Sequence, residues 1–261
     1  MDIPFYQVDA FAGRCLAGNP AAVMLPEGPL EDNVLQAIAE ENNLSETAFL
    51  MRKSGGWSIR WFTPRQEVSL CGHATLASAA VILERIDPSL SEVVFDSASG
   101  PLKVRREGKS FAMDFPAWRP AHADEIEGIA NILGCRVLET ASFKELGLVR
   151  VESAQAVRDV SPDIEGIRGL ALDGLIVTAE GDGGYDFTSR FFAPAIGIDE
   201  DPATGAAHCM LAPFWAERLG RSTFTARQAS RRGADIRCKL TGVRVELQGE
   251  CSFYLEGIVT I

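Results

Sequence analysis

The sequence predicts an α+β protein made of two pseudo-symmetric domains, each with a mixed or antiparallel sheet wrapped around one central helix. Three observations support this fold class. A motif near residue 60 recurs about 130 residues later, each copy is followed by a helix that is apolar on nearly every side, and each half then contains a glycine-centred hairpin. A helix with no polar face is normally buried on all sides, as a sheet wrapped around it would bury it.

The first half contains an exposed helix and a buried one. Residues 31–43 (EDNVLQAIAEENN) have amphipathic spacing, and the run 48–51 is strand-like. A further strand-like run, 68–70, leads into Cys71-Gly72-His73 and a helix over about 73–84, whose letters ATLASAAVIL are apolar all round. Residues 99–115 form a hairpin pattern that turns at Gly108.

The second half repeats this order. Residues 116–122 (PAWRPAH) predict a crossover. A helix over about 205–219 ends before Gly220, and residues 232–247 form a hairpin that turns at Gly242. The last run alternates like a strand and is expected to return to the first half. The predicted domains are therefore 1–115, with about 252–261 returning to it, and 116–251.

The spacing of the repeated features supports a duplicated architecture. RFFAP at 190–194 lies 130 residues after RWFTP at 60–64, Gly205 lies 133 after Gly72, and Gly242 lies 134 after Gly108. Three anchors at nearly one offset indicate two copies of one unit.

Composition excludes several classes of function. The net charge of −11 argues against nucleic-acid or anionic-membrane binding. No apolar run reaches the roughly 18 residues of a membrane span, and the N-terminus lacks the pattern of an export signal. The six scattered cysteines suit free thiols in a reducing compartment. We therefore expect a cytoplasmic protein.

The starts of the two buried helices predict a site. A helix N-terminus presents unpaired N–H groups and a partial positive charge, which suit a carboxylate. If the halves are related by a pseudo-twofold axis, the two N-termini face each other across an interdomain cleft. The candidate chemical groups there are Cys71 and His73 at the first helix, Asp201 at the second, and Glu46 in NNLSETAFL.

Each candidate also has a structural interpretation. Asp201 precedes Pro-Ala-Thr-Gly and, taken alone, resembles a helix N-cap. His73 fits a core or capping histidine equally well, and Glu46 fits a solvated loop carboxylate. Buried cysteines are mostly small hydrophobes, and His208 lies inside the second helix.

Together these motifs resemble the PhzF-like isomerase family of phenazine biosynthesis, whose fold is that of diaminopimelate epimerase. The resemblance spans the whole chain, through DAFAGRCLAGNPAAV, NNLSETAFL, RWFTPRQEVSLCGHATLASAAV, SRFFAP and EDPATGAAHCMLAPFWAERLG. It implies a cofactor-independent, metal-free isomerase that shifts a proton between two carbons of a small carboxylate, and a homodimer.

By the same resemblance, Glu46 is the acid/base, and His73 and Asp201 relay protons or hold the substrate. A carboxylate in a partly apolar cleft can serve as base and then as acid, because burial disfavours its charged form. The expected substrate-binding residues are Asn19, Ser45, Gly72, Thr204, Gly205 and Ala206. Ala206 departs from the family, which has a serine there, and this puts the substrate's identity in question.

Three alternatives remain open. A racemase of the same fold would use a cysteine at each helix mouth, and here only Cys71 is so placed, since Cys209 lies a turn inside the second helix. A non-catalytic binding protein is a second alternative. A metal hydrolase built on His73, Asp201 and His208 is disfavoured because no metal-ligand spacing appears.

Overall fold

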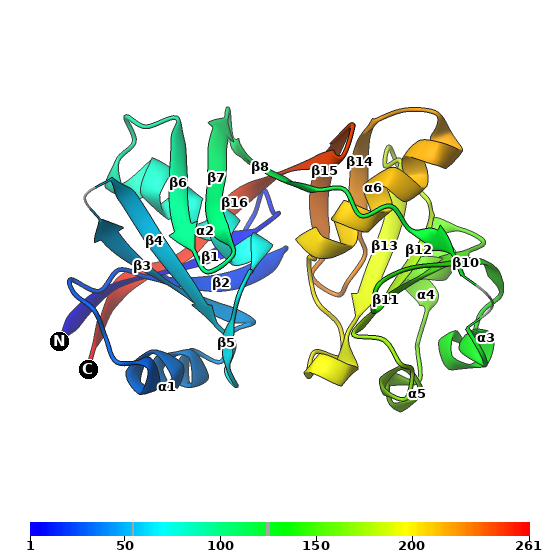
Figure 1. Ribbon diagram of the computed structural model, residues 1–261, viewed down its shortest axis with the longest axis horizontal. Coiled ribbons are helices and arrows are strands. Elements are labelled where there is room, and N and C mark those ends of the chain that lie inside the picture. Colours follow the sequence, from blue (N-terminus) through cyan, green and yellow to red (C-terminus); the bar gives the residue numbers. More distant parts are fainter. Residues whose placement is uncertain (54, 124–125) are drawn as a thin grey trace. The chain divides into compact units, whose positions relative to one another are not determined.

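A computed structural model describes residues 1–53, 55–123 and 126–261. The chain divides into two compact units. Unit 1 contains residues 1–114 and 248–261, and unit 2 contains residues 115–247. Each unit has a sheet and one long buried helix, as the repeat predicts (Figure 1).

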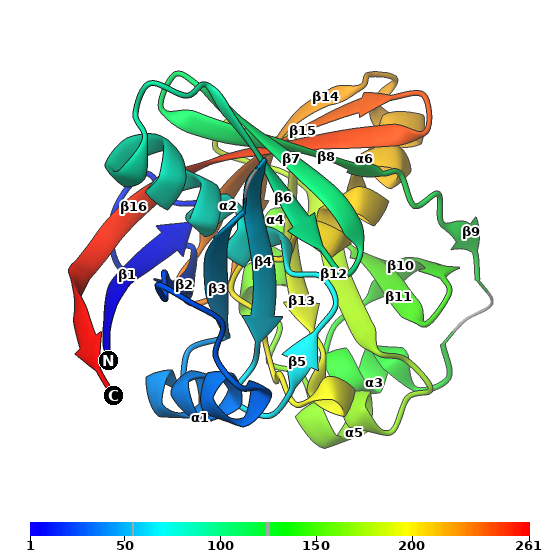
Figure 2. The ribbon, with the colours of Figure 1, turned by 60° about the vertical axis from the view of Figure 1, so that its left-hand side comes forward.

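The sheet of unit 1 alternates antiparallel and parallel neighbours along the order β1-β2-β3-β4-β6-β7. The strands are β1 (Asp2–Ala10), β2 (Asn19–Met24), β3 (Glu46–Lys53), β4 (Gly56–Phe62), β5 (Glu67–Val68), β6 (Glu92–Ser97), β7 (Gly100–Glu107) and β8 (Ser110–Pro116). The last strand, β16 (Arg244–Thr260), is antiparallel to β1, so the two chain termini lie side by side (Figure 2).

Helix α2 (Gly72–Val81) fills the interior of unit 1. Every residue from His73 to Val81 is buried, and the helix packs on β1, β2 and β3. It continues as a π-helical turn, η1 (Ile82–Ile86). Helix α1 (Asp32–Asn42) lies outside the sheet instead and buries Leu35 and Ile38 against the rings of Phe49 and Phe62.

Unit 2 repeats the same alternation of pairings along β10-β11-β12-β13-β14-β15. Its strands are β9 (Ala121–His122), β10 (Val137–Phe143), β11 (Leu146–Val151), β12 (Gly174–Glu180), β13 (Phe187–Phe192), β14 (Thr223–Gln228) and β15 (Ala234–Thr241), with β16 beside β15.

Helix α6 (Gly205–Leu219) is the buried helix of unit 2. It ends at Gly220, whose φ of 66° is the left-handed conformation that glycine adopts readily. Its Trp215 ring stacks on Phe187 with the two ring planes 6° apart. The remaining helices are α3 (Ile129–Leu133), α4 (Ala154–Asp159), α5 (Ile164–Arg168) and the 3₁₀ turn η2 (Pro194–Ile196).

The local predictions are confirmed at both helices and both hairpins, since Gly108 and Gly242 have φ of 66° and 60° in the predicted turns. The prediction for 68–70 is wrong at its end, because β5 stops at Val68 and Leu70 is exposed. No helix in the described part of the chain is long and apolar enough to cross a membrane.

Candidate active site

Glu46 and His73 form a buried pair inside unit 1. Glu46 is the first residue of β3 and His73 is the second residue of α2, and they are 9% and 6% exposed. His73 Nε2 lies 3.1 Å from Glu46 Oε2. The two atoms are within ion-pair distance but outside hydrogen-bond alignment, and neither has a hydrogen-bond partner in the described part of the chain. The prediction of a solvated Glu46 is therefore wrong.

Asn19, Ser45 and Cys71 surround the other side of the His73 ring. Asn19 Nδ2 lies 3.2 Å from Nδ1 of His73, and Cys71 Sγ lies 3.5 Å from the same nitrogen. Ser45 Oγ donates to Asn19 Oδ1 at 3.2 Å. The His73 imidazole thus lies where three segments come together: the start of β2, the residue before β3 and the start of α2.

These contacts select a tautomer of neutral His73. An amide NH₂ only donates, so Nδ1 accepts from Asn19 and the ring proton lies on Nε2, facing Glu46. Protonation of Nδ1 would require the Asn19 amide to present its oxygen instead. The charge of His73 and the orientation of Asn19 are therefore coupled.

The charges around His73 favour its protonated form. Burial disfavours the imidazolium, but the adjacent Cys71 and Glu46 outweigh burial and hold the pKa of His73 well above its ordinary value. Burial, and then the Glu46 charge, raises the pKa of the Cys71 thiol. A thiol with a raised pKa stays neutral near pH 7, so Glu46 supplies the anion that stabilises the imidazolium.

Asp201 and Thr204 form a second polar group, in unit 2. The Thr204 hydroxyl donates to the Asp201 carboxylate. Gln228, which is fully buried at the end of β14, accepts from the Thr204 N–H at 2.8 Å and donates to the Asp201 carbonyl at 2.7 Å. Asp201 does not cap α6, because the N-cap residue is Thr204. The cap interpretation of Asp201 is therefore wrong.

The two buried helices begin alike. The N-caps of α2 and α6 are Cys71 and Thr204, and neither makes a side-chain capping hydrogen bond. The first helical residues are Gly72 and Gly205, as the repeat predicts. Backbone N–H groups at both starts are thus left without a side-chain cap, which suits an anionic ligand.

His208 lies inside α6, where a backbone hydrogen bond holds its ring. Its ring is fully buried in α6, and Nδ1 donates to the Thr204 carbonyl at 2.8 Å. Burial lowers the pKa of His208 to about 4, although that hydrogen bond acts in the opposite direction. It is a structural group that holds the start of α6.

One group of metal-ligating side chains occurs among the described residues, and it is formed by Glu46, Cys71 and His73. Zinc accepts all three ligand types. However, Cys71 Sγ contacts Nδ1 of His73 whereas Glu46 Oε2 contacts Nε2, so the two short contacts are made at different nitrogens of the ring. This arrangement suits proton transfer better than coordination of one ion.

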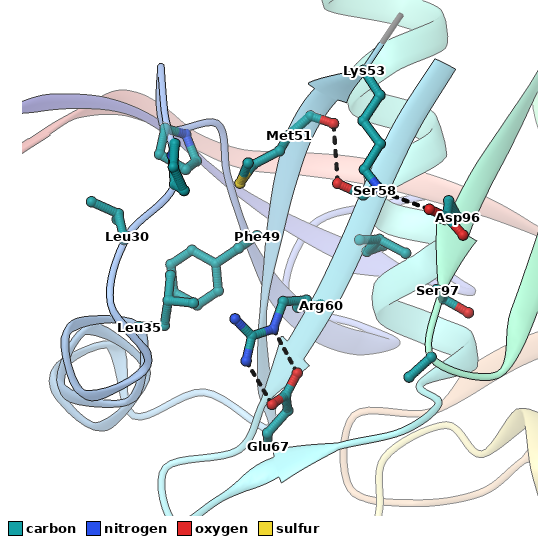
Figure 3. Close-up of a pocket in the computed structure, with 14 residues that line it drawn as sticks. Leu30, Leu35, Phe49, Met51, Lys53, Ser58, Arg60, Glu67, Asp96 and Ser97 are labelled. Atoms are coloured by element: carbon teal, nitrogen blue, oxygen red, sulfur yellow. Dashed lines mark hydrogen bonds and ion pairs between the residues drawn. The ribbon is translucent and has the colours of Figure 1, made fainter. Parts of the chain in front are cut away.

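Each unit also has a pocket. In unit 1 a pocket of about 460 Å³ is lined by residues of β3 and β4, among them Phe49 and Met51, and by the ion pairs Lys53–Asp96 and Arg60–Glu67 (Figure 3). No predicted site residue lines it. In unit 2 a pocket of about 370 Å³ is lined by Asp201, Thr204 and Ala206 among others.

Comparison with known proteins identifies the family. The family model for phenazine biosynthesis-like proteins, PhzC-PhzF, matches residues 8–257. The chain belongs to the PhzC-PhzF family. An uncharacterized isomerase of Pseudomonas aeruginosa is 45% identical, with 100% of both chains covered.

Solved structures confirm the predicted fold. A PhzF-family phenazine biosynthesis protein of Enterococcus faecalis has a TM-score of 0.97 at 38% identity, with 100% of both chains covered. A predicted epimerase of Pseudomonas aeruginosa, at 22% identity, shares the fold with a TM-score of 0.74, covering 99% of this chain and of that chain as well.

Two features of the candidate site were not predicted from the sequence. Gln228 follows Thr204 by 24 residues without any local motif, and only the pairing of β14 beside β13 brings it to the start of α6. The contact of Cys71 with His73 Nδ1 follows from the helix start, where residues two apart can meet across the N-cap.

Proposed function

We propose that this chain is a cofactor-independent isomerase that moves a proton between two carbons of a small carboxylate, with Glu46 as the acid/base. The observation that carries the proposal is the Glu46–His73 pair, a nearly buried carboxylate whose Oε2 has no hydrogen-bond partner in the described part of the chain and lies 3.1 Å from His73 Nε2. The isomerase named among the relatives supports the reaction class.

The two units supply only one such base. The strand registers pair Thr47 with Phe62 in unit 1 and Leu175 with Phe192 in unit 2, so the counterpart of Glu46 is Gly174. A Cβ at Gly174 would lie 2.4 Å from Cζ of Phe191. That position cannot hold a second carboxylate, which favours a mechanism in which one group removes and returns the proton.

The reaction balances without an external reagent. Glu46 takes a proton from the carbon that lies between the carboxylate and the double bond. The electron pair of that C–H bond forms a new double bond to the neighbouring carbon, and the electron pair of the old double bond becomes available at the far carbon to bind a proton. Glu46, or His73 through its Nε2–H, then delivers a proton to the far carbon. In this proposal the helix-start N–H groups hold the carboxylate, and Asp201 and Thr204 serve the same substrate.

A Cys-dependent racemase is the second candidate, and Cys71 is the observation that favours it. Its thiol touches His73 at the start of α2. The counterpart of Cys71 at the start of α6 is Thr204, and Cys209 is 2% exposed inside the helix. A two-cysteine mechanism would therefore lack its second thiol. The isomerases named among the relatives argue against a non-catalytic protein. A homodimer and a cytoplasmic location remain predictions.

The test is deuterium incorporation from D₂O into a panel of β,γ-unsaturated monocarboxylates, followed by NMR. Glu46→Gln keeps the size of the side chain but cannot titrate, and we expect incorporation to fall by about 10²-fold or more. Glu41→Gln, at an exposed position of α1, is the matched control and should leave the rate unchanged. Loss of exchange in Cys71→Ser but not in Glu46→Gln would establish the racemase instead.

A further inference from the structure

The pocket of unit 2 has mostly apolar walls beside Asp201 and Thr204. Its volume of about 370 Å³ lies within the roughly 300–1,000 Å³ typical of small-molecule sites. The apolar side chains come from four separate segments and are Trp118, Phe143, Leu146, Phe191, Ile196 and Ile198. Such walls suit the nonpolar part of a ligand.

The backbone of Trp118 is hydrogen-bonded to a carbonyl of α6 that has no donor four residues later in the helix. Pro213 lies inside this helix and has no N–H to donate to the carbonyl of Cys209, four residues earlier. The backbone N–H of Trp118 donates to that carbonyl at 2.9 Å, and the neighbouring Ala117 N–H donates to Val243 O at 2.8 Å. The main chain of Trp118 is therefore fixed to α6, and this limits where its indole ring can lie.

The other rings are fixed just as firmly. Phe143 stacks on Trp118 with centroids 5.6 Å apart and planes 6° apart. Phe191 is 7% exposed, and its ring lies against Gly174, where a Cβ would be only 2.4 Å away. Three aromatic rings, each held by these contacts, thus line the pocket.

The charges of the lining limit what can enter. Lys144 is the one cation that the described lining contributes, and its Nζ lies 5.8 Å from the Phe143 ring centroid. Glu145, Asp173 and Asp201 contribute carboxylates. A second acidic group on the ligand would be repelled here, whereas an uncharged ring would not. Ala206 adds a methyl group beside Thr204.

We propose that this pocket binds an uncharged aromatic or cyclic apolar group of the substrate, so that the chain acts on aryl-bearing monocarboxylates in preference to short-chain or dicarboxylic acids. The statement about turnover rests on the proposed function. The statement about binding does not, and it can be tested without any reaction.

The experiment compares 3-phenylpropionate, propionate and succinate by calorimetry and ligand-observed NMR. The unsubstituted protein should bind 3-phenylpropionate about tenfold or more tightly than propionate, equivalent to about 1.4 kcal/mol. Succinate should bind no more tightly than propionate. Trp118→Ala should remove most of the advantage of the ring, and Trp118→Phe should keep it. Trp57→Ala, at a partly exposed tryptophan of unit 1, is the matched control and should behave like the unsubstituted protein.

Equal affinity for 3-phenylpropionate and propionate would overturn the proposal, as would a ring advantage that survives in Trp118→Ala. If Trp118→Ala does not fold, Phe143→Leu removes the stacked ring and should lower the same ratio. Tighter binding of 3-phenylpropionate without any deuterium exchange would refute the isomerase proposal alone. Deuterium exchange without tighter binding of 3-phenylpropionate would refute only the pocket proposal.

Discussion

The protonation of His73 should depend directly on the charge of Glu46. At 3.1 Å and an effective dielectric constant of about 20, the attraction between the two charges is roughly 5 kcal/mol. An attraction of this size favours the imidazolium over the neutral ring. We therefore expect Glu46→Gln to lower the pKa of His73, because the Glu46 charge no longer offsets the effect of burial.

The assay is a pH titration of the imidazole resonances by ¹⁵N NMR, which is practical because the chain has three histidines. Exposed His122 and buried His208 serve as internal controls and should not shift. Cys71→Ser should change the His73 midpoint less than Glu46→Gln does, since a neutral thiol acts through its contact with Nδ1 and not through a charge. An unchanged His73 pKa in Glu46→Gln would refute the assignment of Glu46 as the stabilising anion, and a large fall in Cys71→Ser would transfer that role to a thiolate.

Three further outcomes are expected. Asn19→Leu removes the donor to Nδ1, so neutral His73 should lose its preference for the proton on Nε2, visible as averaged ¹⁵N shifts; a retained preference would show that Asn19 does not set the tautomer. His208 has its folded pKa lowered to about 4, so its contribution to stability is intact above the unfolded pKa of about 6.5 and falls as the pH drops towards 4, by about 3 kcal/mol. Urea unfolding of His208→Gln should lack this component, and identical pH slopes in both proteins would contradict it. Ala206→Ser adds a donor beside the helix start and should tighten propionate binding by about tenfold, from a charged hydrogen bond contributing roughly 1.5–3 kcal/mol; equal affinities would show that the position does not contact the carboxylate.

The sequence was sufficient to predict the two buried helices, because a run such as ATLASAAVIL has no polar face to expose. The hairpins were predictable for a similar local reason, since Gly108 and Gly242 alone supply the positive φ that their turns need. The end of α2 was not predictable in this way. Its change to a π-helical turn at Ile82–Ile86 places the Asp87 N–H on the Ile82 carbonyl, and no residue in the run signals it.

The polar groups of the site were predictable as a set but not in their contacts. Glu46 follows a polar loop, and only the register of β3 beside β2 turns it towards α2 and buries it. Asp201 has the spacing of a cap, yet Gln228 from a distant strand orders the segment so that Thr204 becomes the N-cap. Contacts made by strand pairing over long separations leave no local signature.

The central claim is that one carboxylate, Glu46, takes a proton from one carbon and returns it to another. The most direct measurement is the position of the label after incubation of 4-phenyl-3-butenoate in D₂O, read by ¹³C and ²H NMR. Our account predicts movement of the double bond, with deuterium at the carbon two bonds from the one that lost its proton because the protonated Glu46 exchanges with D₂O before it delivers its proton. It also predicts a loss of about 10²-fold or more in the rate of this isomerisation in Glu46→Gln. Deuterium found only at the carbon that lost its proton, at an undiminished rate in Glu46→Gln, would contradict it.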